Sequence, residues 1–282
     1  MLKLKSTDLK TTKVAEEVLL KALFSFDDKK TALYSAVHHT GKIRFDSDFI
    51  IYPLCKLDSL LLVLKENLSK KQSNLSEDAW RDDDLEESSY KIRYLVDENY
   101  RVWFAEEGAA GKKIPAHYQM TGESVSSARC IAAGNITFDK NFGQITAVNH
   151  KSGDFRPEFS SIKWLLAILL AGQDLLEKIN LKFADIITIE ELSSSGGLEK
   201  KHYFSAKSLQ LFIDKIPETI FEAKQPDELK ITSYRAKTQK ILEYRLFSEE
   251  QQKNSPSKIS KKLNFDLEPD LGPPKKARRL FL

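Results

Sequence analysis

Three side chains near the middle of the chain could carry out chemistry together: His117, Asp154 and Glu158. An imidazole exchanges protons near neutral pH, so His117 is the histidine best suited to act as an acid or a base. Asp154 and Glu158 are four residues apart, and two carboxylates that converge can hold Mg²⁺. We therefore predict His117, Asp154 and Glu158 as catalytic residues and the two carboxylates as metal ligands, on condition that all three meet in one pocket.

A structural interpretation of the same segment stays open. Ser152-Gly153-Asp154 can form a turn in which the glycine supplies unusual backbone angles. Pro157 and Glu158 can open the following helix, because proline and an acidic residue are both favoured in a first turn. On this interpretation His117 is an ordinary polar residue.

The order of short motifs between His117 and Glu158 resembles a known module. The motifs are His117-Tyr-Gln-Met-Thr-Gly, Ala132-Ala-Gly-Asn-Ile and Asn149-His-Lys-Ser-Gly-Asp-Phe-Arg-Pro157. They are similar to a pattern of secreted bacterial effectors and polymorphic toxins, also found in plant IQ-motif proteins, that runs HSS, G, AG, NG and N-x-S-G-H-Y-x-P. Some of these effectors are AMP-transferases that host actin activates.

The resemblance assigns roles residue by residue. His117 matches the first histidine of the family, Gly134 the glycine of the AG pair, and Glu158 the glutamate of an HxxxE motif. Ser152 and Gly153 match the SG pair, and Pro157 matches the proline. The resemblance therefore implies a nucleotide site at this segment, with Ser152, Gly153 and Arg156 as cofactor-binding residues.

Two positions depart from the family pattern. Tyr118 stands where a serine follows the first histidine, and Asp154 stands in place of the histidine of HxxxE. An aspartate has a reference pKa near 3.9 and repels a phosphate, so it does not replace a histidine in proton transfer. It can instead hold Mg²⁺ against a triphosphate, together with Glu158.

Two functions follow from these observations. The first is a host-directed bacterial effector with a divergent nucleotidyltransferase module that uses ATP and Mg²⁺ on a host protein. The second is a catalytically silent module that binds a host protein, such as actin, and has a C-terminal targeting or docking tail. The sequence does not decide whether the protein is an enzyme.

Composition and charge limit the class of protein. The longest apolar run, Trp164 to Ala171, is far shorter than a membrane-spanning helix, and the first residues lack a secretory signal pattern, so we expect a soluble chain of the cytosolic type. Two cysteines build no disulfide framework. Residues 253–282 hold eight Lys/Arg and three acids, so the rest of the chain carries a net −2, and a nucleic-acid-binding body is not expected.

The basic tail carries its own signals. We expect residues 250–282 to be disordered, because they are rich in Gln, Asn, Ser, Pro and Lys. A type IV secretion system reads similar tails and delivers effectors into the host cytosol. The basic cluster and Arg278–Leu280 also resemble nuclear-import and cyclin-docking motifs, so an import receptor or a cyclin is a further candidate partner.

The elements that position these residues predict an α+β fold. Apolar residues at helical spacing predict helices from Ser6 or Thr7 to about Phe26, through Tyr34 and Val37, and at 55–70, 160–180, 205–216 and 228–247. Alternating residues predict strands at 92–96, 100–105, 132–138, 144–149, 184–192 and 202–204. We expect a helical N-terminal region (1–75), an acidic loop (76–90), an α+β core with a central antiparallel β-meander and a buried helix after Pro157 (91–249), and the tail (250–282).

Overall fold

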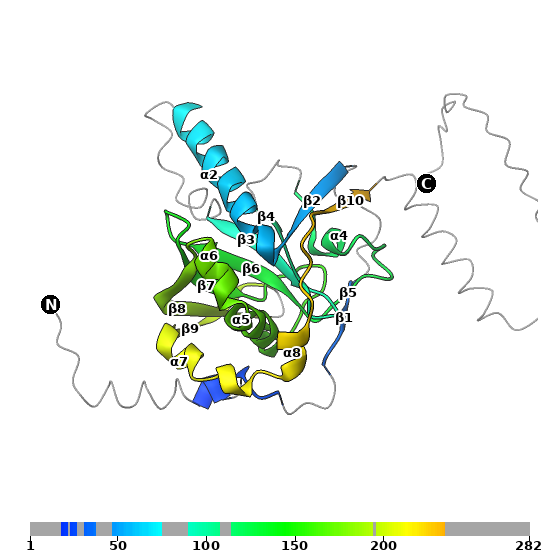
Figure 1. Cartoon of the computed structure of the whole chain (residues 1–282). Helices are drawn as coiled ribbons and strands as arrows, with labels where there is room; N and C mark the ends of the chain where they lie inside the picture. Colours follow the sequence, from blue (N-terminus) through cyan, green and yellow to red (C-terminus); the bar gives the residue numbers. More distant parts are fainter. Residues whose placement is uncertain are drawn as a thin grey trace, which may run out of the picture. The chain divides into compact units, whose positions relative to one another are not determined.

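An eight-stranded mixed sheet is the central element of the computed structural model (Figure 1). The structure describes residues 18–21, 23–26, 31–37, 47–74, 90–107, 114–193 and 196–234. The chain divides into two units, 1–243 and 244–282, and all described residues lie in the first. The predictions for 76–89 and for the tail therefore fall outside the described residues.

The strands of this sheet follow the order β10-β2-β4-β3-β6-β7-β8-β9. Their bounds are Lys230–Tyr234 for β10, Ser47–Pro53 for β2, Val102–Glu106 for β4, Lys91–Val96 for β3, Ala132–Phe138 for β6, Gln144–Asn149 for β7, Lys182–Leu192 for β8 and Leu198–Ser205 for β9. Neighbours pair antiparallel except β7 and β8, which are parallel. A parallel pair needs a crossover, which the helices α5 and α6 between these strands supply.

One face of the sheet carries a layer of helices. This layer contains α2 (Leu57–Asn74), α5 (Ile162–Ala171), α6 (Gln173–Lys178) and α8 (Glu218–Glu222), and α7 (Ala206–Gln210) follows β9 directly (Figure 1). Every residue of α5 from Ile162 to Leu170 is buried, which confirms the predicted buried helix. The helix predicted at 160–180 is broken at Gly172, where a Cβ would lie 3.0 Å from a side-chain carbon of Leu54.

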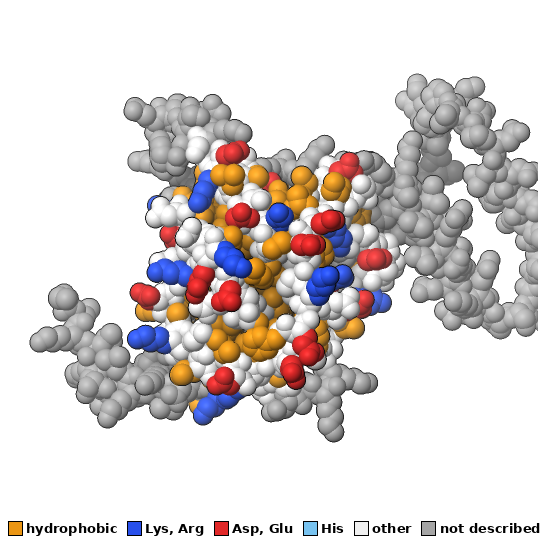
Figure 2. Space-filling model, in the orientation of Figure 1, with side chains coloured by type: hydrophobic (Ala, Val, Ile, Leu, Met, Phe, Trp, Pro, Cys, Tyr) orange, Lys and Arg blue, Asp and Glu red, His pale blue; other side chains and the backbone are white. Residues whose placement is uncertain are grey.

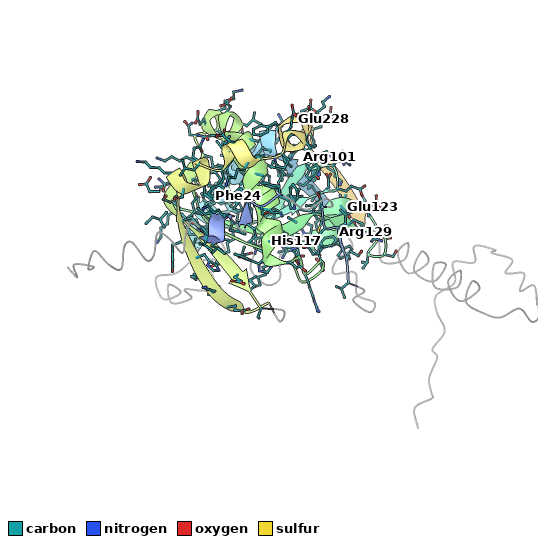
Figure 3. The ribbon with its side chains drawn as sticks, turned by 90° about the horizontal axis from the view of Figure 1, so that it is seen from below. Phe24, Arg101, His117, Glu123, Arg129 and Glu228 are labelled. Atoms are coloured by element: carbon teal, nitrogen blue, oxygen red, sulfur yellow. The ribbon has the colours of Figure 1, made fainter. Side chains whose placement is uncertain are left out.

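The opposite face carries a smaller second core. The short helix α4 (His117–Thr121) lies on this face, with the loops that follow it and a two-stranded sheet of β1 (Tyr34–Ser35) and β5 (Arg129–Cys130). Sheet residues such as Trp103 and Leu95 pack under this cover. Figure 3 shows His117 on this side of the molecule, with Glu123 and Arg129.

The α+β class and most of the predicted elements agree with the structure. Four expectations need correction. Residues 34 and 35 form a strand rather than a helix, and so do Lys230–Tyr234 at the start of the helix predicted at 228–247. The predicted meander is wrong in strand order, because β6 pairs with β3 rather than with β4, and β8 adds a parallel strand. The N-terminal region also contributes β2 to the central sheet, so it is not wholly helical.

None of the helices in the described ranges is both long enough and apolar enough to cross a membrane.

Candidate functional site

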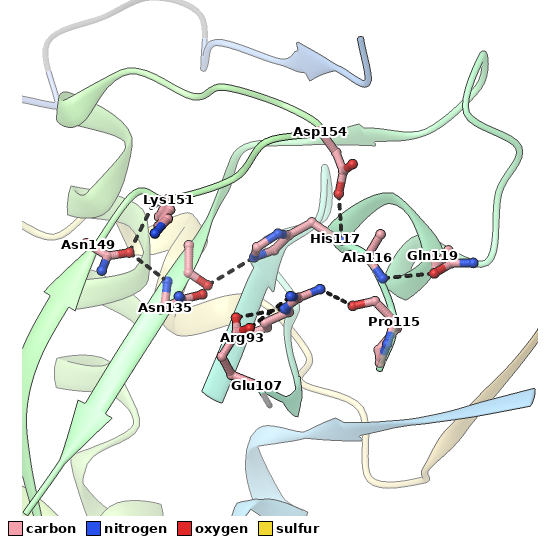
Figure 4. Close-up of polar contacts among 11 residues, drawn as sticks. Arg93, Glu107, Pro115, Ala116, His117, Gln119, Asn135, Asn149, Lys151 and Asp154 are labelled. Carbon is pink, nitrogen blue, oxygen red and sulfur yellow. Dashed lines mark hydrogen bonds and ion pairs between the residues drawn. The ribbon is translucent and has the colours of Figure 1, made fainter. Parts of the chain in front are cut away.

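A row of polar side chains crosses five neighbouring strands on the face that carries α4. Register pairs Arg93 of β3 with Asn135 of β6, Asn135 with Asn149 of β7, Asn149 with Glu190 of β8, and Glu190 with Lys201 of β9. The Asn149 amide links three of these strands. Its Oδ1 accepts from the backbone of Asn135 (Figure 4), and its Nδ2 donates to Glu190 at 3.0 Å. Two residues of this polar row, Asn135 and Asn149, belong to the segment that resembles the effector module.

Gly134 allows the backbone of β6 to lie close to the backbone at the end of β7. A Cβ at Gly134 would lie 2.0 Å from the carbonyl oxygen of Asn149, a separation that no side chain tolerates. That carbonyl also accepts a hydrogen bond of 2.9 Å from the buried hydroxyl of Tyr94. Backbone packing therefore requires a glycine at position 134. This is a physical reason for the glycine of the AG pair, which the sequence identified only by resemblance.

His117 begins α4 and is almost fully buried. Its Nε2 lies 3.1 Å from the carbonyl oxygen of Gly134, so Nε2 carries the proton and Nδ1 is left as an acceptor. Burial lowers the pKa of His117 to about 4, and the nearby positive charge of Arg93 acts in the same direction, while Asp154 opposes it. The imidazole is therefore neutral at physiological pH.

Arg93 is held beside this histidine by a buried ion pair. Its Nε and Nη2 donate to the two carboxylate oxygens of Glu107 at 2.8 and 2.9 Å, and its Nη1 donates to the carbonyl of Pro115. Such a bidentate pair fixes the plane of the guanidinium. Glu107 and Pro115 thereby anchor the chain that leads into α4.

Asp154 lies against the start of α4. Its Oδ2 accepts the backbone N–H of His117 at 2.8 Å, and its own carbonyl accepts from the backbone of Val37 at 2.7 Å. The first N–H groups of a helix have no partner within the helix, so an acceptor from another segment stabilises the helix start. The carboxylate of Asp154 thus joins the 150–158 loop to α4.

Tyr118 occupies a core position rather than a site position. Its ring is buried and lies edge-to-face with Tyr234 of β10, with 5.8 Å between ring centroids. Where the family pattern has a small serine, this chain has an aromatic ring that fills the second core.

The residues predicted to bind a cofactor form a tight turn. Ser152 is buried, and its hydroxyl and carbonyl oxygens accept from the backbones of Phe155 and Arg156. The left-handed residue of the loop is Arg156, with φ 47°, so the expectation that Gly153 supplies the unusual angles is wrong. Gly153 and Arg156 are both exposed. Their role in binding a nucleotide stays a prediction.

Glu158 is exposed. It neighbours Tyr34 of β1, whose hydroxyl pKa is raised mainly by burial; a hydrogen bond with the Glu158 backbone lowers this pKa, and the Glu158 charge raises it. It stands at the N-cap position of the 3-10 turn Phe159–Ser161 that leads into α5, but its side chain makes no capping hydrogen bond. The expectation that Glu158 is an acidic residue of the first helical turn is therefore wrong, because neither this turn nor α5 has an acidic residue in its first turn. In the described structure, no hydrogen bond or ion pair joins Glu158 to His117 or Asp154. The structure therefore shows a direct contact between His117 and Asp154, and the place of Glu158 in the site stays a prediction.

The metal ion that Asp154 and Glu158 were predicted to share stays a prediction. One oxygen of Asp154 accepts the backbone N–H of His117. A search of the described residues finds no group of three or more His, Cys, Asp or Glu able to hold a metal ion. ATP and Mg²⁺ stay predictions from the resemblance.

Sequence reasoning missed His150, which closes the same loop. Its Nδ1 donates to the carbonyl of Pro157 at 2.8 Å, and its Nε2 accepts the backbone N–H of Leu192 at 2.9 Å. Both ring nitrogens are thus bonded, and the loop is tied to the end of β8. The sequence did carry a signal for the polar row, because Asn135 and Asn149 are unusual residues for strand interiors.

Comparison with known proteins returned no match. No family model, no curated protein and no solved structure is significantly similar to this chain.

Proposed function

We propose that this chain is a protein-interaction module that transfers no nucleotide. The observation that supports this proposal is the hydrogen bond between the Asp154 carboxylate and the His117 backbone. Together with the bond from His117 Nε2 to Gly134, it gives both residues a structural task within the loop and α4. On the resemblance, the partner is a host protein, and actin is the first to test.

The second candidate is the divergent nucleotidyltransferase. One observation favours it. Nδ1 of His117 makes no hydrogen bond with any described residue and is unprotonated at neutral pH, so this nitrogen is available as a base. A base whose pKa is about 4 is weak, because efficient proton transfer near neutrality requires a pKa closer to 7. We therefore rank this candidate lower.

One experiment separates the two candidates. The full chain is titrated with ATP and Mg²⁺ in a calorimeter and then incubated with cell lysate and labelled ATP. We expect no binding heat and no labelled protein. We also expect Asp154→Asn and Glu158→Gln to retain the binding of purified actin shown by the parent chain. Label transfer that disappears in Glu158→Gln, with folding preserved, would establish the enzyme instead.

In this proposal the tail serves only as a targeting signal. Arg278–Leu280 and the surrounding basic residues lie outside the described structure, so their reading by a secretion system, an import receptor or a cyclin stays a prediction.

A further inference from the structure

The central sheet ends in two edge strands, β9 and β10, which differ in character. An edge strand presents backbone N–H and C=O groups that can pair with another extended chain, and proteins commonly block such edges with lysine. β9 carries Lys200 and Lys201 in its middle, and both are exposed. β10 has the sequence Lys-Ile-Thr-Ser-Tyr, with its single charge at one end.

The backbone of β10 is paired on one side. It runs antiparallel to β2, with Ile231 opposite Ile50 and Ser233 opposite Asp48. In an antiparallel pair only alternate residues exchange both hydrogen bonds, so the residues between them direct N–H and C=O outward. From Lys230 to Ser233, those outward groups have no backbone partner within the described ranges.

The side chains next to this edge are apolar on the face that carries the helix layer. Ile231 is 69% exposed and its cross-strand partner Ile50 is 50% exposed. Both are β-branched and lie opposite each other on neighbouring strands. Cross-strand pairs of this kind stabilise a sheet. Figure 2 shows hydrophobic side chains at the surface over β2 and β10.

The opposite face of the same strand is rigidly supported. Thr232 and Tyr234 are buried, and the Tyr234 hydroxyl donates to the carbonyl of Glu123 at 2.8 Å. The Nζ of Lys230 donates to the carbonyl of Thr121 and lies 5.0 Å from the centre of the Trp103 ring. These contacts hold β10 against α4 and the residues that follow it, so the edge is already ordered before another strand is added.

We propose that the free edge of β10 is the site at which this module takes up a partner, by pairing with an extended segment of that partner. The segment would carry apolar side chains at alternate positions to cover Ile231 and Ile50. A positive charge would suit its end beside the exposed Asp227 and Glu228, which precede β10 and form no ion pair with other described residues. This inference rests on the proposed interaction function and specifies its surface.

The test uses the full chain and a synthetic fluorescent peptide with valine at alternate positions, threonine between them and an arginine at each end. Fluorescence anisotropy should show saturable binding. Ile231→Lys should weaken it at least about tenfold, because it places a charge where an apolar contact forms. Ile186→Lys is the matched control: Ile186 is 63% exposed on β8, beside the other edge of the sheet, and its variant should bind like the parent chain.

Two further peptides isolate the backbone contribution. In the first peptide, N-methylation of every second amide removes the N–H donors on the edge that faces β10. In the second peptide, the remaining amides are methylated, so the donors that face β10 are kept. One methylated peptide should lose binding and the other should keep it. Equal binding of both, an absence of saturable binding, or an equal loss in Ile186→Lys would overturn the inference. None of these results depends on nucleotide transfer, so the proposed function would be judged separately by the ATP experiment.

Discussion

The buried His117 makes the stability of this protein depend on pH in a specific window. Its pKa is about 4 in the folded state, against a reference value of about 6.5 in an unfolded chain. Between these values the unfolded chain binds more protons than the folded one, so stability falls as the pH drops. The contribution of His117 is fully present above about pH 6.5 and is lost as the pH approaches 4.

The size of this effect follows from the shift. One pKa unit corresponds to about 1.4 kcal/mol, so the free energy of unfolding should fall by about 1 kcal/mol at pH 5.5 and by about 3 kcal/mol at pH 4. These values describe His117 alone. Carboxylates also titrate in this range, so the measurement must isolate the histidine.

The variant His117→Gln provides that isolation. Glutamine keeps an N–H donor that can reach the Gly134 carbonyl but does not titrate. Urea unfolding followed by tryptophan fluorescence, at steps between pH 7 and pH 4, should show that the parent chain loses about 3 kcal/mol more than the variant. NMR titration of the imidazole should give a midpoint near 4. Parallel pH profiles for the two proteins would refute the reasoning.

Three further predictions concern the loop and its surroundings. Gly134→Ala should destabilise the fold by on the order of 4 kcal/mol because of the clash with the Asn149 carbonyl, whereas Gly153→Ala, whose Cβ would meet no atom within 4 Å, should be close to neutral in the same urea assay. Asp154→Ala should cost about 2 kcal/mol, since it leaves a backbone N–H unpaired, and Asp154→Asn should cost less while moving the His117 titration midpoint lower, because it removes the charge that raises that pKa. Burial raises the pKa of the Cys130 thiol, so a thiol reagent should label Cys55 first in the folded chain and reach Cys130 only on unfolding; equal labelling rates would contradict this.

The elements that the sequence predicted well are those with strong local patterns. The leucine spacing of α2 and the all-round apolar surface of α5 are visible within one segment of chain. β10 was missed because its five residues become a strand only by pairing with Ser47–Pro53, far away in the sequence. The β-branched Ile231 and Thr232 weakened the helix prediction at this point, but they did not by themselves indicate which strand β10 pairs with.

The candidate site was predictable in its membership but not in its geometry. The motif match placed His117, Gly134 and Asp154 in one segment, and the structure does bring these three together. The motif could not show the backbone of this loop, because its left-handed residue is Arg156 rather than the glycine that the sequence suggested. The contributions of Arg93 and Asn149 required the strand register, which the sequence does not contain.

Asp154 and Tyr118, the two residues that differ from the effector pattern, both make contacts that hold α4 in place. A carboxylate has only acceptor oxygens, and Asp154 uses one of them for the N–H at the start of α4, a bond that a protonated imidazole could not accept. Tyr118, one residue further along, turns its ring into the second core against Tyr234. Both residues hold α4 in a fixed position. Thr121 of α4 and Glu123, two residues after it, accept hydrogen bonds from Lys230 and Tyr234 of β10, so a fixed α4 stabilises the edge that we propose as the docking site. The two positions at which this chain differs from the effector pattern that it resembles are therefore linked, through α4, to the surface at which we expect its partner.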